Sequence, residues 1–586
     1  MFSFAVFDSA GLPRTSFELR GEHLIGNDDM PAQAEIRFEN GLLICTKQGP
    51  EAAGISLLVD VPAPPAVPPS PPSPGVPGLP APVPSLGQLM LRTCFLPKRE
   101  EPYLLSLELA RHRIMLTLNK LEEWGMFELA PDHPALVQLE AARLKFGEAL
   151  VADRSGSVSA GGSAQPSARA WADKLAWEAL AIALDVSEKL SLMNAMREMP
   201  GRLTGQVFED AKARYTKLIG DPPPAGQHVV VPGMGTAVVP GAPQIGIAIN
   251  PGQFSEPLVK AATAFDFLQM PVRWSDLEPV EGKLSFGATD RWIEWAVRNA
   301  KKTVNAGPIL DLRAACLPEW IYIWENDYET LRDMMVEHIT QVVTRYRRTV
   351  TRWTVCSGLH VNSNVKLSYE QIMDLTKVCI LLTKKIHPQG KILVEIQEPW
   401  GEYFAHDRKS LPPTFYAESV LNLGLGVDGL GLRLQIGAPV SGQSARDLMM
   451  ISSLIDRYAA MERPLHITAV GAPSAPISIS ASDTKTAADE DEQVVISARE
   501  HAAGRWRSPW SEGVQADWLA DVISILVSKP SVQSICWQDL ADAPPSARSP
   551  EMPFGGILNT AGAPKASGQR LAQLLQTLRE GKAPAL

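Results

Sequence analysis

The sequence has few cysteines and no long hydrophobic run. Its 586 residues include 6 cysteines, which are scattered without CxxC or other metal-ligand spacing. This pattern argues against a disulfide framework and against a zinc site. No stretch approaches the 18 uninterrupted apolar residues of a membrane span, and the N-terminal stretch has neither the basic start nor the apolar run of a signal peptide. We therefore expect a cytoplasmic protein that binds no membrane.

Positive charge is also scarce. Lysine and arginine number 55 against 65 aspartates and glutamates, for a net charge of −10. A negative net charge disfavours nucleic-acid binding by bulk electrostatics. The sequence contains no HExxH motif, no phosphate-binding P-loop and no GxGxxG on a strand–helix turn. We predict no nucleic-acid partner, no metal and no cofactor.

Residues 1–98 carry several short stretches of strand-forming residues, separated by Asn-, Asp- and Gly-rich turns. They predict a small β-rich, sandwich-like domain. Residues 61–85 interrupt it with 12 prolines. Because proline lacks the amide hydrogen that a β-sheet needs, this stretch is expected to form an extended loop.

Helical periodicity follows in residues 99–199, with apolar residues at three- and four-residue steps in 103–124, 134–151 and 168–199. The last of these is long and broadly apolar. It is expected to pack against another part of the chain or a second subunit, so a homo-oligomer formed through this helical segment is possible. Residues 200–243 are rich in proline and glycine and are predicted to be a linker.

From residue 244 the pattern alternates between strand and helix. Eight strand candidates alternate with eight helical patterns up to residue 586. An alternation of this size predicts an α/β fold, a C-terminal (β/α)8 TIM barrel preceded by the β-rich domain and the helical segment. The strand candidates are residues 245–250, 267–274, 303–312, 352–356, 392–396, 429–435, 465–470 and 532–537.

The stretch VRWSDLEPVEG at 272–282 resembles the second-strand region of glycoside hydrolase family 10, the endo-1,4-β-xylanases. The resemblance spans 244–586 and does not reach the first 240 residues. It implies a barrel with the active site at the carboxyl ends of the strands, and hydrolysis of β-1,4-linked xylose polymers with retention. Further matches in the family's order are LPEW at 317–320, WTV at 353–355, DGLGL at 428–432, HIT at 466–468, WQD at 537–539, GIL at 556–558 and APK at 563–565.

The resemblance also implies two catalytic glutamates, and this chain has neither. Retaining hydrolysis needs two carboxyl groups about 5–5.5 Å apart. The family's acid/base follows an asparagine after the fourth strand, where this chain has Ser357 and Gly358. Its nucleophile follows Ile-Thr in the seventh strand, where this chain has Ala469. We therefore expect a xylanase-like pseudoenzyme.

Other carboxylates at predicted strand ends leave a different possibility open. Glu398, Asp539 and Asp311 are candidates for a relocated catalytic pair, Glu398 with Asp539 or Asp311. Glu398 belongs to the stretch 395–403, which is rich in carboxylates and aromatic rings. The simpler interpretation is that these carboxylates are solvated or paired with arginines.

Aromatic, amide and charged side chains near the predicted barrel mouth are candidates for carbohydrate binding. His360 can also serve as a general base or as a hydrogen-bonded structural imidazole. An insertion after the seventh strand carries two tryptophans, and can act as a lid or as a plug. The candidate ligand-binding residues are Arg273, Trp274, His360, Trp400, Gln435, Trp506, Trp510, Trp537 and Gln538.

Three hypotheses follow from the sequence. The first, which we favour, is a noncatalytic xylanase relative that binds a carbohydrate or small ligand in the barrel cleft. The second is an active glycoside hydrolase with relocated carboxylates. The third is a structural or assembly protein that makes its contacts through the N-terminal domains.

Overall fold

The computed structural model describes residues 1–26, 29–49, 51–65, 85–157, 166–224, 228–477, 503–543 and 552–584. Most of the predicted proline-rich loop and the acidic part of the insertion after the seventh strand therefore lie outside the described residues. Among the helices of the described part, none is long and apolar enough to cross a membrane.

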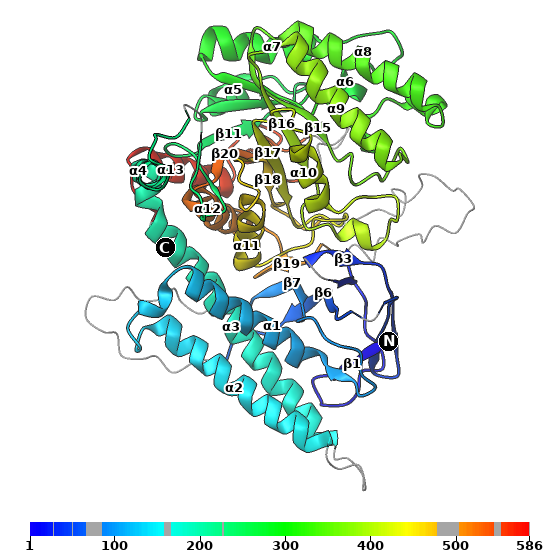
Figure 1. The fold of residues 1–586 in the computed structure, drawn as a ribbon, viewed down its shortest axis with the longest axis vertical. Helices are drawn as coiled ribbons and strands as arrows, with labels where there is room; N and C mark the ends of the chain where they lie inside the picture. The colour runs from blue at the N-terminus through cyan, green and yellow to red at the C-terminus, as the bar shows by residue number, and fades with distance from the viewer. Residues whose placement is uncertain are drawn as a thin grey trace.

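The C-terminal part is a closed parallel β-barrel, as predicted (Figure 1). The strand order is β13-β12-β11-β20-β18-β17-β16-β15-β14, and the pairing of β13 with β15 closes the ring. The predicted third strand is split into β13 and β14, which both pair with β15. The strands are β11 (Gln244–Ala248), β12 (Phe267–Met270), β13 (Thr303–Ala306), β14 (Leu310–Asp311), β15 (Val350–Ser357), β16 (Lys391–Ile396), β17 (Gly429–Gln435), β18 (Leu465–Gly471) and β20 (Val532–Trp537).

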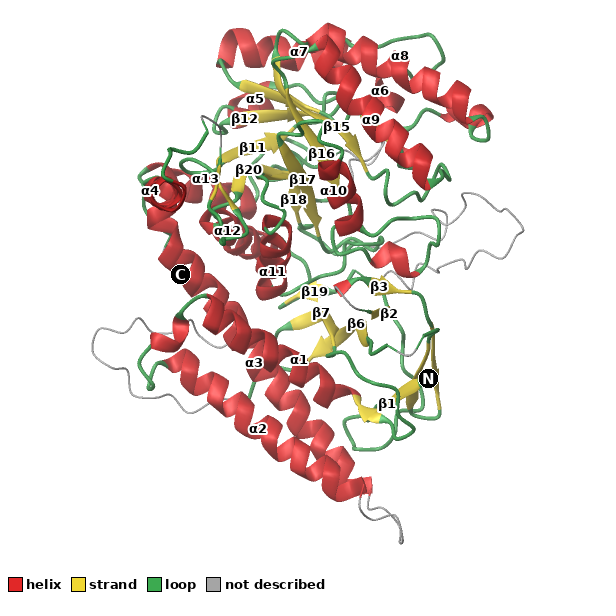
Figure 2. Ribbon diagram, in the orientation of Figure 1, coloured by secondary structure: helices red, strands yellow, loops and turns green. Residues whose placement is uncertain are grey.

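Helices surround this barrel (Figure 2). Several begin at side-chain caps, which satisfy backbone amides that lack partners at a helix start. Ser368 forms a capping box with Gln371 at α9, and the Asp447 side chain caps α11. The helices are α5 (Glu256–Ala262), α6 (Trp274–Leu277), α7 (Gly287–Glu294), η3 (Trp295–Ala300), η4 (Ala314–Cys316), η5 (Glu319–Trp324), α8 (Tyr328–Tyr346), α9 (Tyr369–Ile386), η6 (Glu402–Ala405), α10 (Pro413–Asn422), α11 (Leu448–Ala459), α12 (Glu512–Ser528) and α13 (Ala566–Arg579).

The N-terminal residues form two small sheets, in the orders β4-β5-β1-β8 and β19-β7-β6-β2-β3. The last strand to join them, β19 (Arg505–Trp506), comes from the insertion after β18 and pairs antiparallel with β7. The barrel chain thus supplies an edge strand to the N-terminal sheet. The other strands are β1 (Phe2–Ala5), β2 (His23–Ile25), β3 (Pro31–Ala32), β4 (Glu35–Glu39), β5 (Leu42–Thr46), β6 (Gly54–Val61), β7 (Gly87–Arg92) and β8 (Tyr103–Leu104).

Three long helices follow, α1 (Leu105–Glu123), α2 (Pro134–Ser157) and α3 (Pro166–Leu203). Together with the two sheets they form what we call the N-terminal module, residues 1–203. Figure 1 shows α3 running from this helical layer up to the barrel, where it packs against α11 and α12. The predicted contact of α3 with another part of the chain is therefore confirmed. Oligomer formation through this segment stays a prediction.

The described residues of this next segment, 200–224 and 228–243, hold more secondary structure than the predicted linker. They contain α4 (Gln206–Ile219) and the hairpin of β9 (Val229–Val230) and β10 (Ala237–Val238). Their valines and Ala211 bury a small core of their own, which the proline and glycine content of the stretch conceals. The buried Arg202 guanidinium donates to the carbonyls of Val239 and Val532, and this fixes the segment to the barrel.

Candidate functional site

The carboxyl ends of the barrel strands enclose a polar cavity of about 50 Å³, which we call the barrel pocket. In (β/α)8 barrels the active site lies at this end. By the same volume measure one water needs about 10–15 Å³, so the cavity holds a few water-sized groups. Six charged residues line it, namely Arg273, Arg313, Arg433, Asp311, Glu395 and Asp539, together with Gln269, Thr468, Ala469 and Gln538.

Asp311, at the end of β14, is clamped by Arg313. The Arg313 Nε donates to both carboxylate oxygens at 3.0 Å, and the backbone N–H of Arg313 donates to Oδ1 at 3.1 Å. Burial alone would raise the pKa of Asp311, but the charge and hydrogen bonds of Arg313, with the Arg433 charge, hold it below its ordinary value. Asp311 is therefore an ionised carboxylate with both oxygens engaged.

Glu395 lies on β16 opposite Ser357 of β15, and the two side chains meet. The Ser357 hydroxyl donates to Glu395 Oε1 at 2.5 Å, and Arg433 Nε donates to the same oxygen at 3.2 Å. Glu395 is only 1% exposed. Sequence reasoning favoured Glu398 and missed the contact between Glu395 and Arg433. The signal was a charge inside each of two apolar barrel strands, KILVEI and GLGLRLQ.

Asp539 follows β20 and is half-buried. Burial raises the pKa of Asp539 to about 7, although the Arg273 charge opposes the rise; the neighbouring Asp542 charge adds to it. Asp539 therefore holds a proton up to near-neutral pH. The barrel pocket thus combines one carboxyl that is protonated near neutrality with a second, Asp311, that is ionised.

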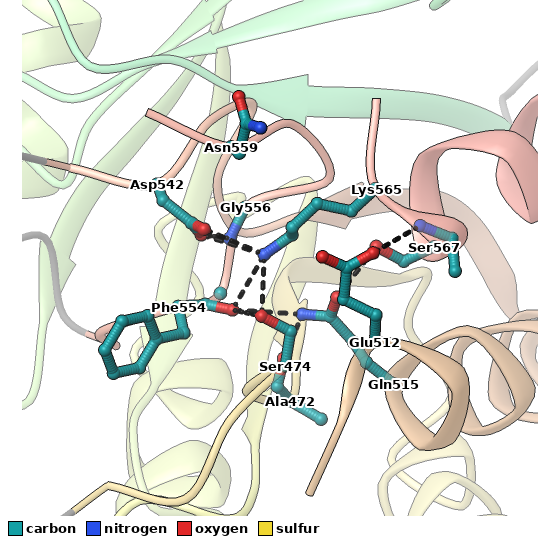
Figure 3. A network of polar contacts seen from close by, with 12 residues as sticks. Ala472, Ser474, Glu512, Gln515, Asp542, Phe554, Gly556, Asn559, Lys565 and Ser567 are labelled. Carbon is teal, nitrogen blue, oxygen red and sulfur yellow. Dashed lines mark hydrogen bonds and ion pairs between the residues drawn. The ribbon is translucent and has the colours of Figure 1, made fainter. Parts of the chain in front are cut away.

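Figure 3 shows a network of polar contacts around Lys565 and Asp542, which is three residues after Asp539 in the chain. Lys565 Nζ donates to both oxygens of Asp542 at 2.9 and 3.0 Å, to Ser474 Oγ at 2.9 Å and to the Phe554 carbonyl at 3.1 Å. These contacts join the loop after β18 to the segments on either side of residues 544–551. The network therefore holds the segment after β20, which carries Gln538 and Asp539.

Replacing Asp539 with asparagine is expected to stabilise the protein more at pH 8 than at pH 4. The folded-state pKa of about 7 exceeds the ordinary value of 3.8. Protonated Asp539 therefore stabilises the folded state at low pH. This contribution to the free energy of unfolding is lost as the pH rises through about 7. Asparagine resembles the protonated form. We expect the difference in melting temperature between variant and wild type to increase by about 2–4 °C from pH 4 to pH 8.

Asp333→Asn on the exposed face of α8 is the control, and its difference in melting temperature should not grow with pH in this way. Equal effects of Asp539→Asn on the melting temperature at both pH values would contradict a buried Asp539 with a raised pKa.

Glu398 does not line the barrel pocket. Its backbone has φ +46°, its Oε2 accepts a hydrogen bond from Ser441 Oγ at 2.8 Å, and burial raises the pKa of Glu398 to about 8. The structure therefore brings Asp311 and Asp539 to the pocket but not Glu398. Glu398 thus does not form the predicted catalytic pair with Asp311 or Asp539 in the barrel pocket.

Two tryptophans predicted to bind a ligand lie in the core instead. Trp274 is 3% exposed, donates its indole N–H to Glu278 at 2.9 Å and stacks on His338 with ring centroids 4.5 Å apart. Trp537 is fully buried and donates to the Gly555 carbonyl at 2.9 Å. Each large ring is surrounded by protein and has its polar atom satisfied, so contact with a ligand has no support in the geometry.

His360 is also a structural group. Its ring is fully buried, its Nε2 lies 2.9 Å from the Gln397 carbonyl, and it stacks on Tyr416 with centroids 4.8 Å apart. Burial lowers the pKa of His360 to about 4. The neutral imidazole therefore belongs to the packing behind β15, and the interpretation as a general base is not supported.

Both tryptophans of the insertion after β18 are buried, and Trp506 attaches the barrel to the N-terminal module. Trp506, 1% exposed, donates its indole N–H to Glu188 of α3 at 2.8 Å. Trp510, 5% exposed, donates to the Gly504 carbonyl at 3.2 Å. Neither tryptophan is among the residues that line the barrel pocket, so the geometry supports neither predicted role, lid or plug, for Trp506 and Trp510.

The remaining candidates are divided between the pocket and the interface with the module. Gln538 lines the barrel pocket, and Gln435 Nε2 donates to its Oε1 at 2.6 Å. Trp400 lies away from the pocket, with the Arg446 guanidinium 4.4 Å from its ring centroid. Arg273 lines the pocket as predicted.

The backbone at position 358 disfavours a side chain. Gly358 has φ +66°, a left-handed conformation, and a Cβ atom built there lies 2.1 Å from Gln397 Oε1. Ala469 lies on β18 beside Arg433 of β17 and lines the barrel pocket. The backbone after β15 is thus shaped for glycine.

Comparison with known proteins shows which family this barrel is similar to. The family model described as glycosyl hydrolase family 10 matches residues 239–372, which contain the first four strand positions. The C-terminal barrel is family 10-like. The match ends within α9, so it does not extend to β16, β17, β18 and β20.

Curated relatives and solved structures are of the same kind. Endo-1,4-beta-xylanase B of Neocallimastix patriciarum is 23% identical over 249 residues, 38% of this chain and 26% of that protein. Endo-1,4-beta-xylanase B of Humicola insolens is 32% identical over 83 residues, 14% of this chain and 22% of that protein. The chain thus spans about a quarter of the length of these relatives. Xylanase 10B from Thermotoga maritima is 17% identical, with a TM-score of 0.41 over 58% of this chain and 97% of that one.

Proposed function

We propose that this protein is a catalytically inactive member of the xylanase-like barrels that binds a carbohydrate or a similar small polyhydroxylated ligand in the barrel pocket. The observation that carries the proposal is the pair Gly358 and Ala469. By resemblance they occupy the two catalytic glutamate positions. At the first of them the left-handed backbone disfavours any side chain, and a Cβ atom there would displace the amide end of Gln397.

The chemistry of the barrel pocket supports ligand binding. Guanidinium groups donate hydrogen bonds, carboxylates accept them, and the amides of Gln269 and Gln538 do both. Sugar hydroxyls are donors and acceptors at once, so a wall that alternates these groups matches them. The small volume admits one end of such a ligand.

The engagement of the carboxylates argues against relocated catalysis. A nucleophile or general base needs an available oxygen. Both oxygens of Asp311 are bound by Arg313, whereas Glu395 accepts from Ser357 and Arg433 at one oxygen, Oε1, so of these two carboxylates Asp311 is the one without an available oxygen. A specific observation nevertheless favours hydrolysis as the second candidate, because the pKa values of Asp539 and Asp311 are shifted in opposite directions within one pocket. In that case Asp539 would be the acid.

Xylobiose binding, measured by calorimetry, tests the proposal. We expect saturable heat without release of xylose. Arg273→Gln should weaken the affinity about tenfold, because a charged hydrogen-bond donor is lost from the pocket wall. Arg273 contacts Asp276 only at 3.7 Å, so its removal leaves no close ion pair broken.

Arg143→Gln, which removes a surface arginine paired with Glu140 on α2, is the control and should bind like the wild type. Absence of saturable binding, or equal binding by Arg273→Gln, would count against the proposal. Xylose release that Asp539→Asn abolishes would favour the second candidate.

A further inference from the structure

We propose that a second cavity, between the N-terminal module and the barrel, binds a small oxyanion, a phosphate or carboxylate group. This interface cavity has a volume of about 30 Å³. Its walls come from β2, β3, β6, β7 and α1 of the module, and from α11 and the loops after β16 and β17 of the barrel. It shares no lining residue with the barrel pocket.

Positive charge exceeds negative charge around the interface cavity. Four arginines line it, Arg92, Arg113, Arg446 and Arg457, and Asp29 is the one carboxylate among the lining residues. Asp29 is shared, since Arg92 and Arg457 each donate to it at 2.7 Å. Arg113 is held by Asp447, and Arg446 by Glu402. Four guanidinium groups therefore meet three carboxylates, which leaves one positive charge for a ligand to balance.

The two histidines in the wall, His112 and His23, are neutral rings and add no charge of either sign. Arg92 Nε donates to His112 Nε2 at 2.9 Å, so this nitrogen is the acceptor of a neutral imidazole. Burial, followed by the Arg92 and Arg113 charges, lowers the pKa of His112 well below its ordinary value. Burial likewise lowers the pKa of His23, against the Glu402 charge.

The unsatisfied polar atoms of the cavity wall are all donors. Among the described residues that line it, the buried side-chain atoms without a hydrogen-bond partner are Arg113 Nε, Arg446 Nε and Trp400 Nε1. Arg113 and Arg446 are 2% and 3% exposed. A buried donor without an acceptor costs free energy, and an oxyanion offers several acceptor atoms with the charge that the site requires. The planar fork of arginine suits phosphate and carboxylate oxygens in particular.

The proposal is tested on the full chain by calorimetric titration with sodium phosphate and with sodium acetate, each against sodium chloride at matched ionic strength. We expect saturable binding of one oxyanion and none of chloride. Saturation at a lower concentration of phosphate than of acetate would identify a phosphate site, and the reverse order would identify a carboxylate site. Because ligand binding to the folded state alone raises its stability, the same anion should raise the melting temperature.

Arg457→Gln should weaken this binding about tenfold, because a guanidinium group is lost from the wall. Asp29 keeps Arg92 in this variant, so folding should be preserved. Arg457→Lys retains the charge and should recover part of the affinity. Arg332→Gln on α8 is the matched control, since Arg332 also donates to a single aspartate at 2.7 Å and its side chain is 32% exposed against 29% for Arg457.

Absence of saturable binding of both oxyanions overturns the proposal, as does unchanged binding by a folded Arg457→Gln variant. The outcome is independent of xylobiose binding in the barrel pocket, which Arg457→Gln should leave unchanged.

Discussion

Gly358→Ala is expected to lower the free energy of unfolding by about 1–2 kcal/mol. The residue has φ +66°, where a side chain costs about 1–2 kcal/mol. The new Cβ would also lie 2.1 Å from Gln397 Oε1, the far end of a flexible side chain that has to move aside.

Denaturant unfolding of Gly358→Ala beside Gly287→Ala measures this effect. Gly287 begins α7, and a Cβ there meets nothing within 4 Å. The control should therefore unfold close to the wild type. If Gly358→Ala is as stable as the control, the backbone after β15 does not exclude a side chain.

The same geometry bears on function. A Gly358→Glu/Ala469→Glu double variant should not gain xylanase activity, because the glutamate at 358 would not reach a productive position on an intact backbone. Hydrolysis of xylan by this double variant would show that the two positions are vacant catalytic sites on an otherwise competent barrel.

The buried pair Arg113–Asp447 should be the strongest single link between the N-terminal module and the barrel. Two hydrogen bonds of 2.8 and 2.6 Å join the side chains, which are 3% and 0% exposed. Removing one member of such a pair leaves an uncompensated buried charge and costs about 3–5 kcal/mol. Asp447→Asn removes the charge while retaining a residue that can cap α11, so we expect a loss near the lower end of this range.

A double-mutant cycle with Arg113→Met tests this account. The double variant Arg113→Met/Asp447→Asn should unfold at a higher denaturant concentration than Asp447→Asn, because no unpaired guanidinium is left in the interface. Arg332→Gln, which breaks a half-exposed pair, should cost about 1 kcal/mol or less. Additive losses in the double variant would mean that the two charges do not stabilise each other.

Much of the barrel could be predicted from the sequence because its strands are buried on both faces and separated by helical patterns. All eight strand positions are confirmed, with differences at their ends. The third strand is split at Gly307–Pro308, and the second ends at Met270, so that Trp274 begins α6. Apolar residues continue past both points, and periodicity alone does not locate such breaks.

The attachment of β19 to β7 could not be predicted. It joins residues 505–506 to residues 87–88, and no local pattern encodes a strand pairing across such a distance in sequence. The tryptophans of the insertion were therefore assigned to the barrel mouth, whereas Trp506 lies against Glu188 of α3.

The candidate site was predicted in part. Arg273, Asp311, Asp539 and Gln538 line the barrel pocket, since each lies at the end of a strand or within three residues after it. The aromatic candidates failed because a large ring near a strand end suits a sugar cleft and a core equally well in sequence. Glu395 escaped notice because it lies within a strand.

Turnover of an aryl β-xylobioside by the wild-type protein tests the central claim most directly. The proposed pseudoenzyme releases no phenol above the rate without protein, and Asp311→Asn and Asp539→Asn give the same blank result. Saturable release that Asp539→Asn abolishes would contradict it and establish a relocated catalytic acid.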